Sequence, residues 1–199
     1  MVAKCPFLKI PLGLYFEVTS GILLKNLRAF EIHIVNLPQK RNVYTKEFEI
    51  RWSDVDANLH LRNSAYIDYM SHTRMSYFQD HGFDQRRLHQ LQIGPVALYE
   101  HMFYFKEVFP GEPVSVSLQL KGVSEEGTFF SFEHNFYSTS GKNLARCEML
   151  GAWIDLKTRK LIHAPKELWD FLEGMVKTHD FKTLTKEDTR RHGQIPKDL

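Results

Sequence analysis

The chain has 199 residues, of which 43% are hydrophobic and 25% are charged. These values are typical of one globular domain with extensions, and they exclude wholesale disorder and fibrous repeats. The net charge is only +2, and the central segment 44–155 is acidic, with ten Lys and Arg against fifteen Asp and Glu. Because a nucleic-acid-binding protein concentrates positive charge on its binding domain, we expect no nucleic-acid partner.

The two cysteines, Cys5 and Cys147, are far apart in the chain. Their spacing offers neither a disulfide scaffold nor a zinc cluster, a pattern typical of a reduced, intracellular protein. Charged residues interrupt every apolar run in the N-terminal region, and the apolar stretch 10–16 is too short for a signal peptide. We therefore expect a cytoplasmic protein with no membrane span, no metal site and no cofactor.

The N-terminal segment 1–43 is the least readable part of the sequence. Residues 29–37 alternate as a strand does until Pro38 stops them, so we expect an N-terminal extension of unclear structure. From residue 44 to residue 52 the alternation is clear. It predicts a half-buried strand whose apolar face consists of Phe48, Ile50 and Trp52.

A polar loop over residues 53–60 follows this strand and leads into a helix. Asn63 or Ser64 can cap the helix, and its apolar positions recur every three or four residues. Gly82 is a natural stop, so the helix should end near His81, and a loop that contains Arg86 and Arg87 should follow it.

The remaining core elements are predicted to be strands. Four alternating segments are separated by turns at Pro110-Gly111, at Glu125-Glu126-Gly127 and at Ser140-Gly141. The segments are 94–108, 114–121, 129–136 and 145–153. On the third of them, four aromatic side chains either form the core or line an acyl tunnel: Phe129, Phe130, Phe132 and Phe136.

A second helix should begin at Pro165, with an apolar stripe of Leu168, Leu172 and Met175/Val176. Beyond Lys177 the charged tail is expected to be frayed. One long helix cannot cover both faces of such a sheet, so the sheet must wrap around it and bury further surface elsewhere. A second copy of the chain is the obvious partner, and we expect a homodimer or a dimer of dimers.

The connection between the first strand and the helix, residues 51–66, holds two carboxylates and a histidine. It resembles the start of hotdog-fold thioesterases of the 4-hydroxybenzoyl-CoA thioesterase and acyl-ACP thioesterase group. Their pattern is an acidic-x-Asp loop, often followed by Asn-x-His-x-x-Asn and an aromatic residue one helical turn later. The residues that match this pattern are Asp54, Asp56, Asn58, His60, Asn63 and Tyr66.

The resemblance covers about residues 44–165, because the strand pattern and the segment 153–160 with Pro165 match the closing strand and turn of the family. It implies an α+β hotdog fold, in which an antiparallel sheet of five to six strands wraps around one long central helix, with an additional C-terminal helix. The predicted organisation is an extension (1–43), a hotdog domain (44–165) and a C-terminal helix with a charged tail (166–199).

The resemblance also implies hydrolysis of an acyl thioester of CoA or of acyl carrier protein, with Asp56 as the catalytic carboxylate. Such a carboxylate serves as a general base for water, or it attacks the carbonyl and forms a mixed anhydride. Backbone N–H groups at the helix start, near Asn63 and Ser64, are candidates for stabilising the oxyanion.

The other matching residues have two interpretations each. His60 orients Asp56 or the substrate, or it is a surface histidine, and Asn63 is a plain cap or a donor to the oxyanion. Asn58 and Tyr66 are candidate substrate contacts, although Tyr66 also suits the core. Asp54 is expected to act as a hydrogen-bond acceptor that structures the loop.

Two other functions remain open. Hotdog dehydratases and hydratases resemble this fold, but they depend on a catalytic histidine with an acidic partner, and the Asp-x-Asp loop favours hydrolysis. A non-catalytic acyl-thioester-binding protein would need no carboxylate at position 56. Three basic residues either meet CoA phosphates or are solvated strand residues: Lys106, Lys121 and Arg146.

Overall fold

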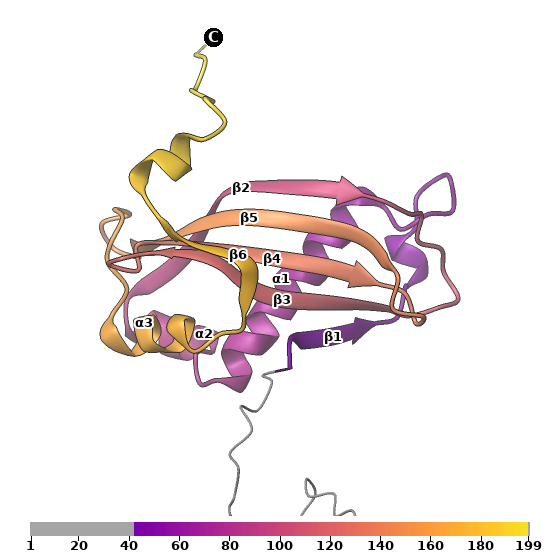
Figure 1. The fold of residues 1–199 in the computed structure, drawn as a ribbon, viewed down its shortest axis with the longest axis horizontal. Coiled ribbons are helices and arrows are strands. Elements are labelled where there is room, and N and C mark those ends of the chain that lie inside the picture. Colours follow the sequence, from indigo (N-terminus) through magenta and orange to yellow (C-terminus); the bar gives the residue numbers. More distant parts are fainter. Residues whose placement is uncertain (1–41, 199) are drawn as a thin grey trace, which may run out of the picture. The chain divides into compact units, whose positions relative to one another are not determined.

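A computed structural model describes residues 42–198, so the predicted extension 1–43 lies almost wholly outside the described residues. Six strands form one sheet (Figure 1). Its main path, in order across the sheet, is β1 (Tyr44–Phe48), β3 (Val114–Ser124), β4 (Phe129–Tyr137), β5 (Asn143–Asp155) and β2 (Ile93–Tyr104). Each neighbouring pair on this path is antiparallel. Tight turns account for this at β3–β4 and β4–β5, which follow one another in the chain, whereas β2 pairs with β5 and not with the strand that follows it.

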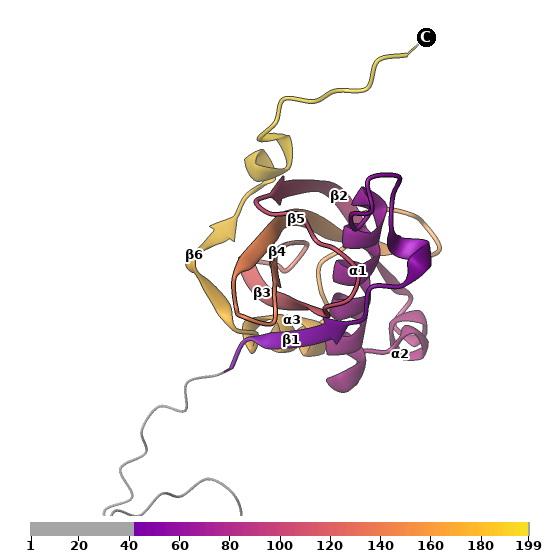
Figure 2. The same cartoon turned by 90° about the vertical axis from the view of Figure 1, so that its right-hand side faces the viewer.

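The sheet curls around the long helix α1 (Asn63–Asp80), as Figure 2 shows. The buried residues of α1 recur with helical spacing and are Ala65, Tyr66, Tyr69, Met70, Thr73 and Phe78. A further helix, α3 (Lys166–Glu173), buries Leu168 and Leu172 of the predicted stripe. The α+β architecture, with a sheet around one long helix and an added C-terminal helix, is therefore confirmed.

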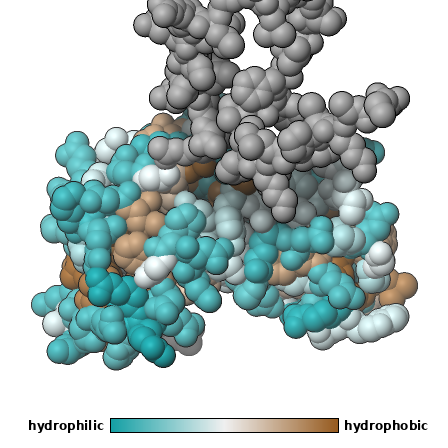
Figure 3. Space-filling model, turned by 90° about the horizontal axis from the view of Figure 1, so that it is seen from below, coloured by the Kyte–Doolittle hydropathy of each residue, from teal (hydrophilic) through white to brown (hydrophobic). Residues whose placement is uncertain are grey.

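The core lies between α1 and the inner face of the sheet. Strand alternation places Phe130, Phe132 and Phe136 of β4 there, with Trp153 of β5, and all four are almost fully buried. On the face seen in Figure 3, hydrophilic residues cover most of the visible described surface. Among the helices between residues 42 and 198, none has the length and hydropathy needed to cross a bilayer.

The predicted strand over residues 44–52 is shorter in the structure. β1 ends at Phe48, and a 3-10 turn, η1 (Trp52–Asp54), follows. The Asp54 carboxylate accepts a hydrogen bond from the backbone N of Arg51 at 3.3 Å, and such local bonds compete with strand pairing. Ile50 is buried as predicted, whereas Trp52 is 87% exposed.

Two further boundaries differ from the prediction. Helix α2 (Gln85–Gln90) lies in a segment predicted to be a loop, and Asp84 caps it by accepting from the backbone N of Arg87 at 2.7 Å. Strand β2 ends at Tyr104 rather than at residue 108. The chain leaves the ladder there because the backbone N atoms of residues 105 and 106 both donate to the carbonyl O of Leu144.

The prediction of a frayed tail is wrong over β6 (Lys177–Leu184), which pairs in parallel with β3. β1 pairs with Val114–Leu118 of β3 and β6 pairs with its other half, Leu120–Ser124, so two strands share one edge of β3. Gly122 permits this approach, because a Cβ there would lie 2.8 Å from the carbonyl O of Lys182. Long-range pairing therefore orders a segment whose own sequence is mostly polar.

Candidate active site

Asp56 begins a tight loop between Val55 and Leu61, which pair in an isolated β-bridge. Its backbone N donates to the carbonyl O of His60 at 2.9 Å. Its Oδ1 accepts from the backbone N atoms of Asn58 at 2.8 Å and of His60 at 3.1 Å. Within residues 42–198, Oδ2 has no hydrogen-bond partner. The loop thus holds one carboxylate oxygen and leaves the other available.

Asp54 holds this loop in place through hydrogen bonds. Its side chain is 1% exposed and accepts from Arg51 Nε at 2.8 Å, from Arg51 Nη2 at 3.0 Å and from the Tyr69 hydroxyl at 2.8 Å. The Arg51 hydrogen bonds, and then that of Tyr69, outweigh burial and lower the pKa of Asp54 to about 2. Its carbonyl O also accepts from the backbone N of Arg62 at 2.8 Å. Asp54 therefore structures the loop, as predicted.

The start of α1 differs by one position from the prediction. Arg62 occupies the N-cap position, and Asn63 is the first helical residue rather than the cap. The Asn63 side chain accepts from the backbone N of Ser64 at 2.8 Å, and the Ser64 hydroxyl accepts from the Arg62 guanidinium. In the described part of the chain, the backbone N–H of Asn63 has no partner. Of the two predicted backbone donors, the one at Asn63 is therefore free.

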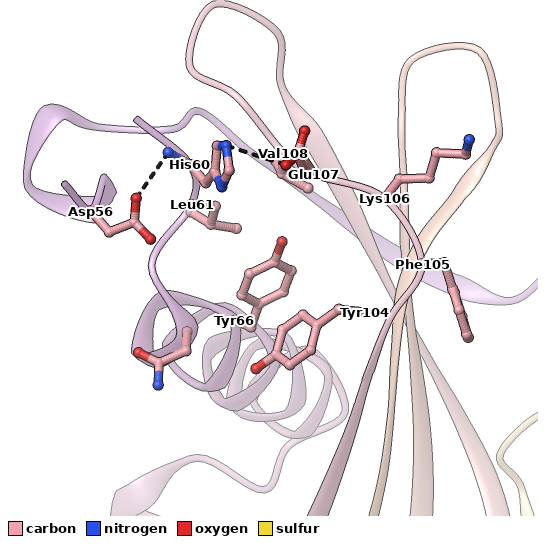
Figure 4. Close-up of a pocket in the computed structure, with 10 residues that line it drawn as sticks. Asp56, His60, Leu61, Tyr66, Tyr104, Phe105, Lys106, Glu107 and Val108 are labelled. Carbon is pink, nitrogen blue, oxygen red and sulfur yellow. Dashed lines mark hydrogen bonds and ion pairs between the residues drawn. The ribbon is translucent and has the colours of Figure 1, made fainter. Parts of the chain in front are cut away.

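A cavity of about 370 Å³ opens where the loop, the start of α1 and the end of β2 meet (Figure 4). Its walls are formed by Asp56, His60, Leu61, Asn63, Tyr66, Tyr104, Phe105, Lys106, Glu107 and Val108. Four of the six predicted site residues thus line one cavity. The two others, Asn58 and Ser64, are not among the described residues that line it, although both bond to residues that do.

Tyr66 serves the core and the cavity together. Its side chain is nearly buried, with its ring 5.2 Å from that of Tyr104 and 5.0 Å from that of Phe136 between centroids. Burial first, then the neighbouring Tyr104 and the negative charge of Asp56, raise the pKa of Tyr66 to about 12. Its hydroxyl therefore stays protonated at neutral pH.

The His60 ring turns towards the end of β2. Its Nε2 lies 3.5 Å from a carboxylate oxygen of Glu107, and its ring packs edge-on against Phe109 at 4.9 Å. Figure 4 shows that the bond from His60 to Asp56 comes from the backbone N and not from the ring. Any residue at position 60 would supply this backbone bond, so both interpretations of the His60 side chain stay open.

The contribution of β2 to the cavity was missed by the sequence reasoning. Tyr104 and Glu107 lie 38 and 41 positions beyond Tyr66, the last residue of the motif. The two segments meet through the bond from the backbone N of Leu61 to the carbonyl O of Val108 (2.7 Å) and through the ring contact between Tyr66 and Tyr104. Among the three basic candidates, Lys106 lines the cavity, whereas Lys121 and Arg146 are engaged with acidic side chains of the sheet.

The fold is that of a hotdog-fold thioesterase-like protein. The family model of the Thioesterase-like superfamily matches residues 50–172, and the chain belongs to that family. No curated protein matches the sequence. Within residues 42–198, no group of three or more His, Cys, Asp or Glu is placed to hold a metal ion.

Solved structures with the same fold include several thioesterases. A 1,4-dihydroxy-2-naphthoyl-CoA thioesterase from Synechocystis is 14% identical with a TM-score of 0.60, over 67% of this chain and 97% of that one. A Staphylococcus aureus hypothetical protein in complex with CoA is 17% identical with a TM-score of 0.61, over 79% and 96%. A probable thioesterase from Escherichia coli is 20% identical with a TM-score of 0.58, over 67% and 99%. At these identities, the likeness establishes the fold.

Proposed function

We propose that this protein hydrolyses acyl-CoA thioesters to a free acid and CoA, with the reaction at Asp56 and the start of α1. One observation carries the proposal: the Asp56 carboxylate and Asn63, whose backbone N–H is unpaired within residues 42–198, line the same cavity. Thioester hydrolysis needs a group that activates or replaces water and a donor for the oxyanion, and these two groups meet both needs. Membership of the family supports thioester hydrolysis in general.

Two routes use the Asp56 carboxylate. As a general base, Oδ2 takes a proton from a water whose oxygen bonds to the carbonyl carbon; the C–S bond then breaks and the CoA thiolate receives the proton. As a nucleophile, Oδ2 bonds to the carbonyl carbon itself, the thiolate leaves, and water hydrolyses the mixed anhydride. In both routes, the bonds from Asn58 and His60 to Oδ1 orient the carboxylate.

The start of α1 supplies the electrophilic side of the site. The N–H of Asn63 carries the partial positive charge of a helix N-terminus, which stabilises the negative charge that develops on the thioester oxygen. Tyr66 retains its proton at neutral pH, because its pKa is about 12, and it contributes a second donor at the cavity. Asn58 and Ser64 support these groups from outside the cavity.

We favour CoA over acyl carrier protein as the carrier. Lys106 lies at the cavity and provides a cation for a phosphate group. The Staphylococcus aureus neighbour, which shares the fold, was solved in complex with CoA.

We also propose that the protein is a homodimer joined through β2. In the described sheet, β2 is an edge strand of twelve residues, and exposed edges of this length call for pairing or protection. Large exposed apolar side chains cluster on and just beyond it, namely Leu98, Phe103, Tyr104 and Phe105. Pairing there would place the partner beside the cavity. Sedimentation should report a dimer at micromolar concentration, and an active monomer would contradict the arrangement.

The test of the proposed function is a thiol-release assay against acyl-CoAs of graded chain length. Wild type should hydrolyse at least one of them, and Asp56→Asn should lower kcat by about 10²-fold or more with the fold retained. Asp170→Asn, which changes an exposed carboxylate on α3, is the matched control and should behave as wild type. Full turnover by a folded Asp56→Asn protein would remove the carboxylate mechanism.

Two further assays on the same protein distinguish thioester hydrolysis from the other two candidate functions. A dehydratase or hydratase would add water to a 2-enoyl-CoA without releasing thiol. A non-catalytic binding protein would bind a thioether analogue of acyl-CoA while releasing no thiol from the parent thioester.

A further inference from the structure

A second cavity, of about 160 Å³, lies between α1 and the sheet. Phe78 of α1 and the β4 residues Phe130 and Phe132 give it a largely apolar, aromatic wall. Among the residues that line it, Arg74 is the one with a cationic side chain. A guanidinium at the wall of an apolar cavity is unusual, because a buried charge is costly unless it is well paired.

Arg74 is only partly paired. Its side chain is 15% exposed; Nη2 donates to Ser71 Oγ at 2.9 Å and reaches a Glu100 carboxylate oxygen only at 3.5 Å. Nη1 lies 3.3 Å from Nε2 of His134. A guanidinium has five N–H groups. In the described part of the chain, its Nε–H and one N–H of Nη1 make no hydrogen bond.

His134 does not add charge to this cluster. Its ring is fully buried, and Nδ1 lies 2.8 Å from the carbonyl O of Ser117, to which it must donate, so Nε2 accepts from Arg74. Burial, and then the neighbouring Arg74, lower the pKa of His134 to about 3, which keeps the ring neutral. The charges of Arg74 and Glu100 therefore cancel, and two N–H groups of Arg74 remain without an acceptor among the residues that the structure describes.

From this arrangement we infer that the second cavity receives the far end of the acyl group, and that Arg74 binds an uncharged oxygen on it, such as a hydroxyl or oxo group. The inference rests on the proposed function and names its substrate class. Aromatic walls suit the hydrocarbon part, and the spare N–H groups require an acceptor. An uncharged oxygen accepts hydrogen bonds from these N–H groups and leaves the buried Arg74–Glu100 pair neutral. A carboxylate would add a negative charge beside the pair.

The two cavities lie along the same helix α1, one at its first turn and the other about three turns further on. Tyr66, Met70 and Arg74 follow one another at intervals of four residues and so lie along one stripe of the helix. Asn63 and Arg74 are separated by about 16 Å along the helix axis, and the Arg74 side chain leans back towards Asn63. An extended chain advances about 1.2 Å per bond, so acyl groups of about 8 to 12 carbons span the gap. Met70 is fully buried between the cavities, so the inference requires the acyl chain to displace its side chain, which is unbranched and adapts readily.

The test uses matched pairs of acyl-CoAs of about 8, 10 and 12 carbons, each with and without a terminal hydroxyl, and a third member with a terminal carboxylate. For at least one length, wild type should prefer the hydroxylated member in kcat/KM by about 10- to 100-fold, the factor that a hydrogen bond to a charged group supplies. Equal rates within every pair, or a preference for the plain chain, would overturn the inference. A preference for the carboxylate would overturn the uncharged class.

A double variant, Arg74→Met/Glu100→Gln, removes the donors without leaving Glu100 as an unpaired buried charge. Its ratio of kcat/KM values within the pair should fall to about one. Arg87→Met, which removes an exposed arginine paired with Glu167, is the control and should keep the wild-type ratio. A preference that survives in the double variant would refute the role of Arg74, and the wild-type comparison decides the inference even if the double variant does not fold.

Thioether analogues of the same pairs separate this inference from the proposed function. Calorimetry should show tighter binding of the hydroxylated thioether to wild type whether or not the thioester is hydrolysed. Discrimination in binding without thiol release would refute hydrolysis and retain the oxygen site. If thiol is released but neither kcat/KM nor binding affinity differs between the hydroxylated and plain chains, hydrolysis is retained and the oxygen site is refuted.

Discussion

Asn63→Pro should remove one proposed oxyanion donor and leave α1 in place. Asn63 is the first residue of the helix, where proline is well tolerated because that N–H has no intrahelical partner. The preceding residue, Arg62, has φ −63° and ψ 148°, which is the extended conformation that a following proline favours. Within residues 42–198 the N–H of Asn63 forms no hydrogen bond, so no described structural bond is lost with it.

The magnitude follows from what the substitution removes. Asn63→Pro deletes the backbone N–H and the side chain that accepts from Ser64, whereas Asn63→Ala deletes only the side chain. Losing the side-chain acceptor of the Ser64 N–H costs about 1 kcal/mol of stability, the net value of one hydrogen bond, and both variants share that loss. Removal of one oxyanion donor lowers kcat by about 10²- to 10³-fold, and only the proline variant should show it.

The assay pairs turnover with affinity. Thiol release gives kcat for both variants, and calorimetry gives the affinity for a thioether analogue, which carries no developing oxyanion. We expect the proline variant to bind the analogue within a few-fold of the alanine variant while its kcat falls. Circular dichroism should show equal helix content in the two. If both variants have the same kcat, the N–H of Asn63 is not an oxyanion donor, and if binding and kcat fall together, residue 63 only holds the ligand.

Two further predictions concern stability. Asp54→Asn should lower the free energy of unfolding at pH 7 by about 2 kcal/mol, because the pKa of Asp54 falls from 3.8 to about 2 in the folded protein. A lowered pKa stabilises the folded state above about pH 4 and loses that effect as the pH approaches about 2, so urea titrations of wild type and variant should converge there. Gly122→Ala should cost about 1–3 kcal/mol, since its Cβ would meet the Lys182 carbonyl, and hydrogen exchange should rise over β6 while β1 stays protected.

Local signals in the sequence were sufficient for the central helix and the motif loop. Gly82 and the three-to-four-residue repeat of apolar positions predict a helix to about His81, and α1 ends at Asp80. The alternation of apolar and polar residues that predicts β3 to β5 is also a local signal, because side chains on one face of a strand recur at every second residue. The spacing of Asp56, His60, Asn63 and Tyr66 places all four on one loop and the first turns of one helix, and all four line the cavity.

Only the tertiary structure decided which distant segments complete the site and the sheet. Tyr104 and Glu107 reach the cavity because α1 and β2 meet at one end of the sheet, a meeting that no periodicity of either segment reports. β6 is ordered by pairing with the half of β3 that β1 leaves uncovered, although its own residues are mostly polar. Trp52 is exposed because the bonds of Asp54 to Arg51 turn the chain just where strand alternation would bury it. Local pattern decides what each segment forms, whereas contacts between distant segments decide which of them share an edge or a cavity.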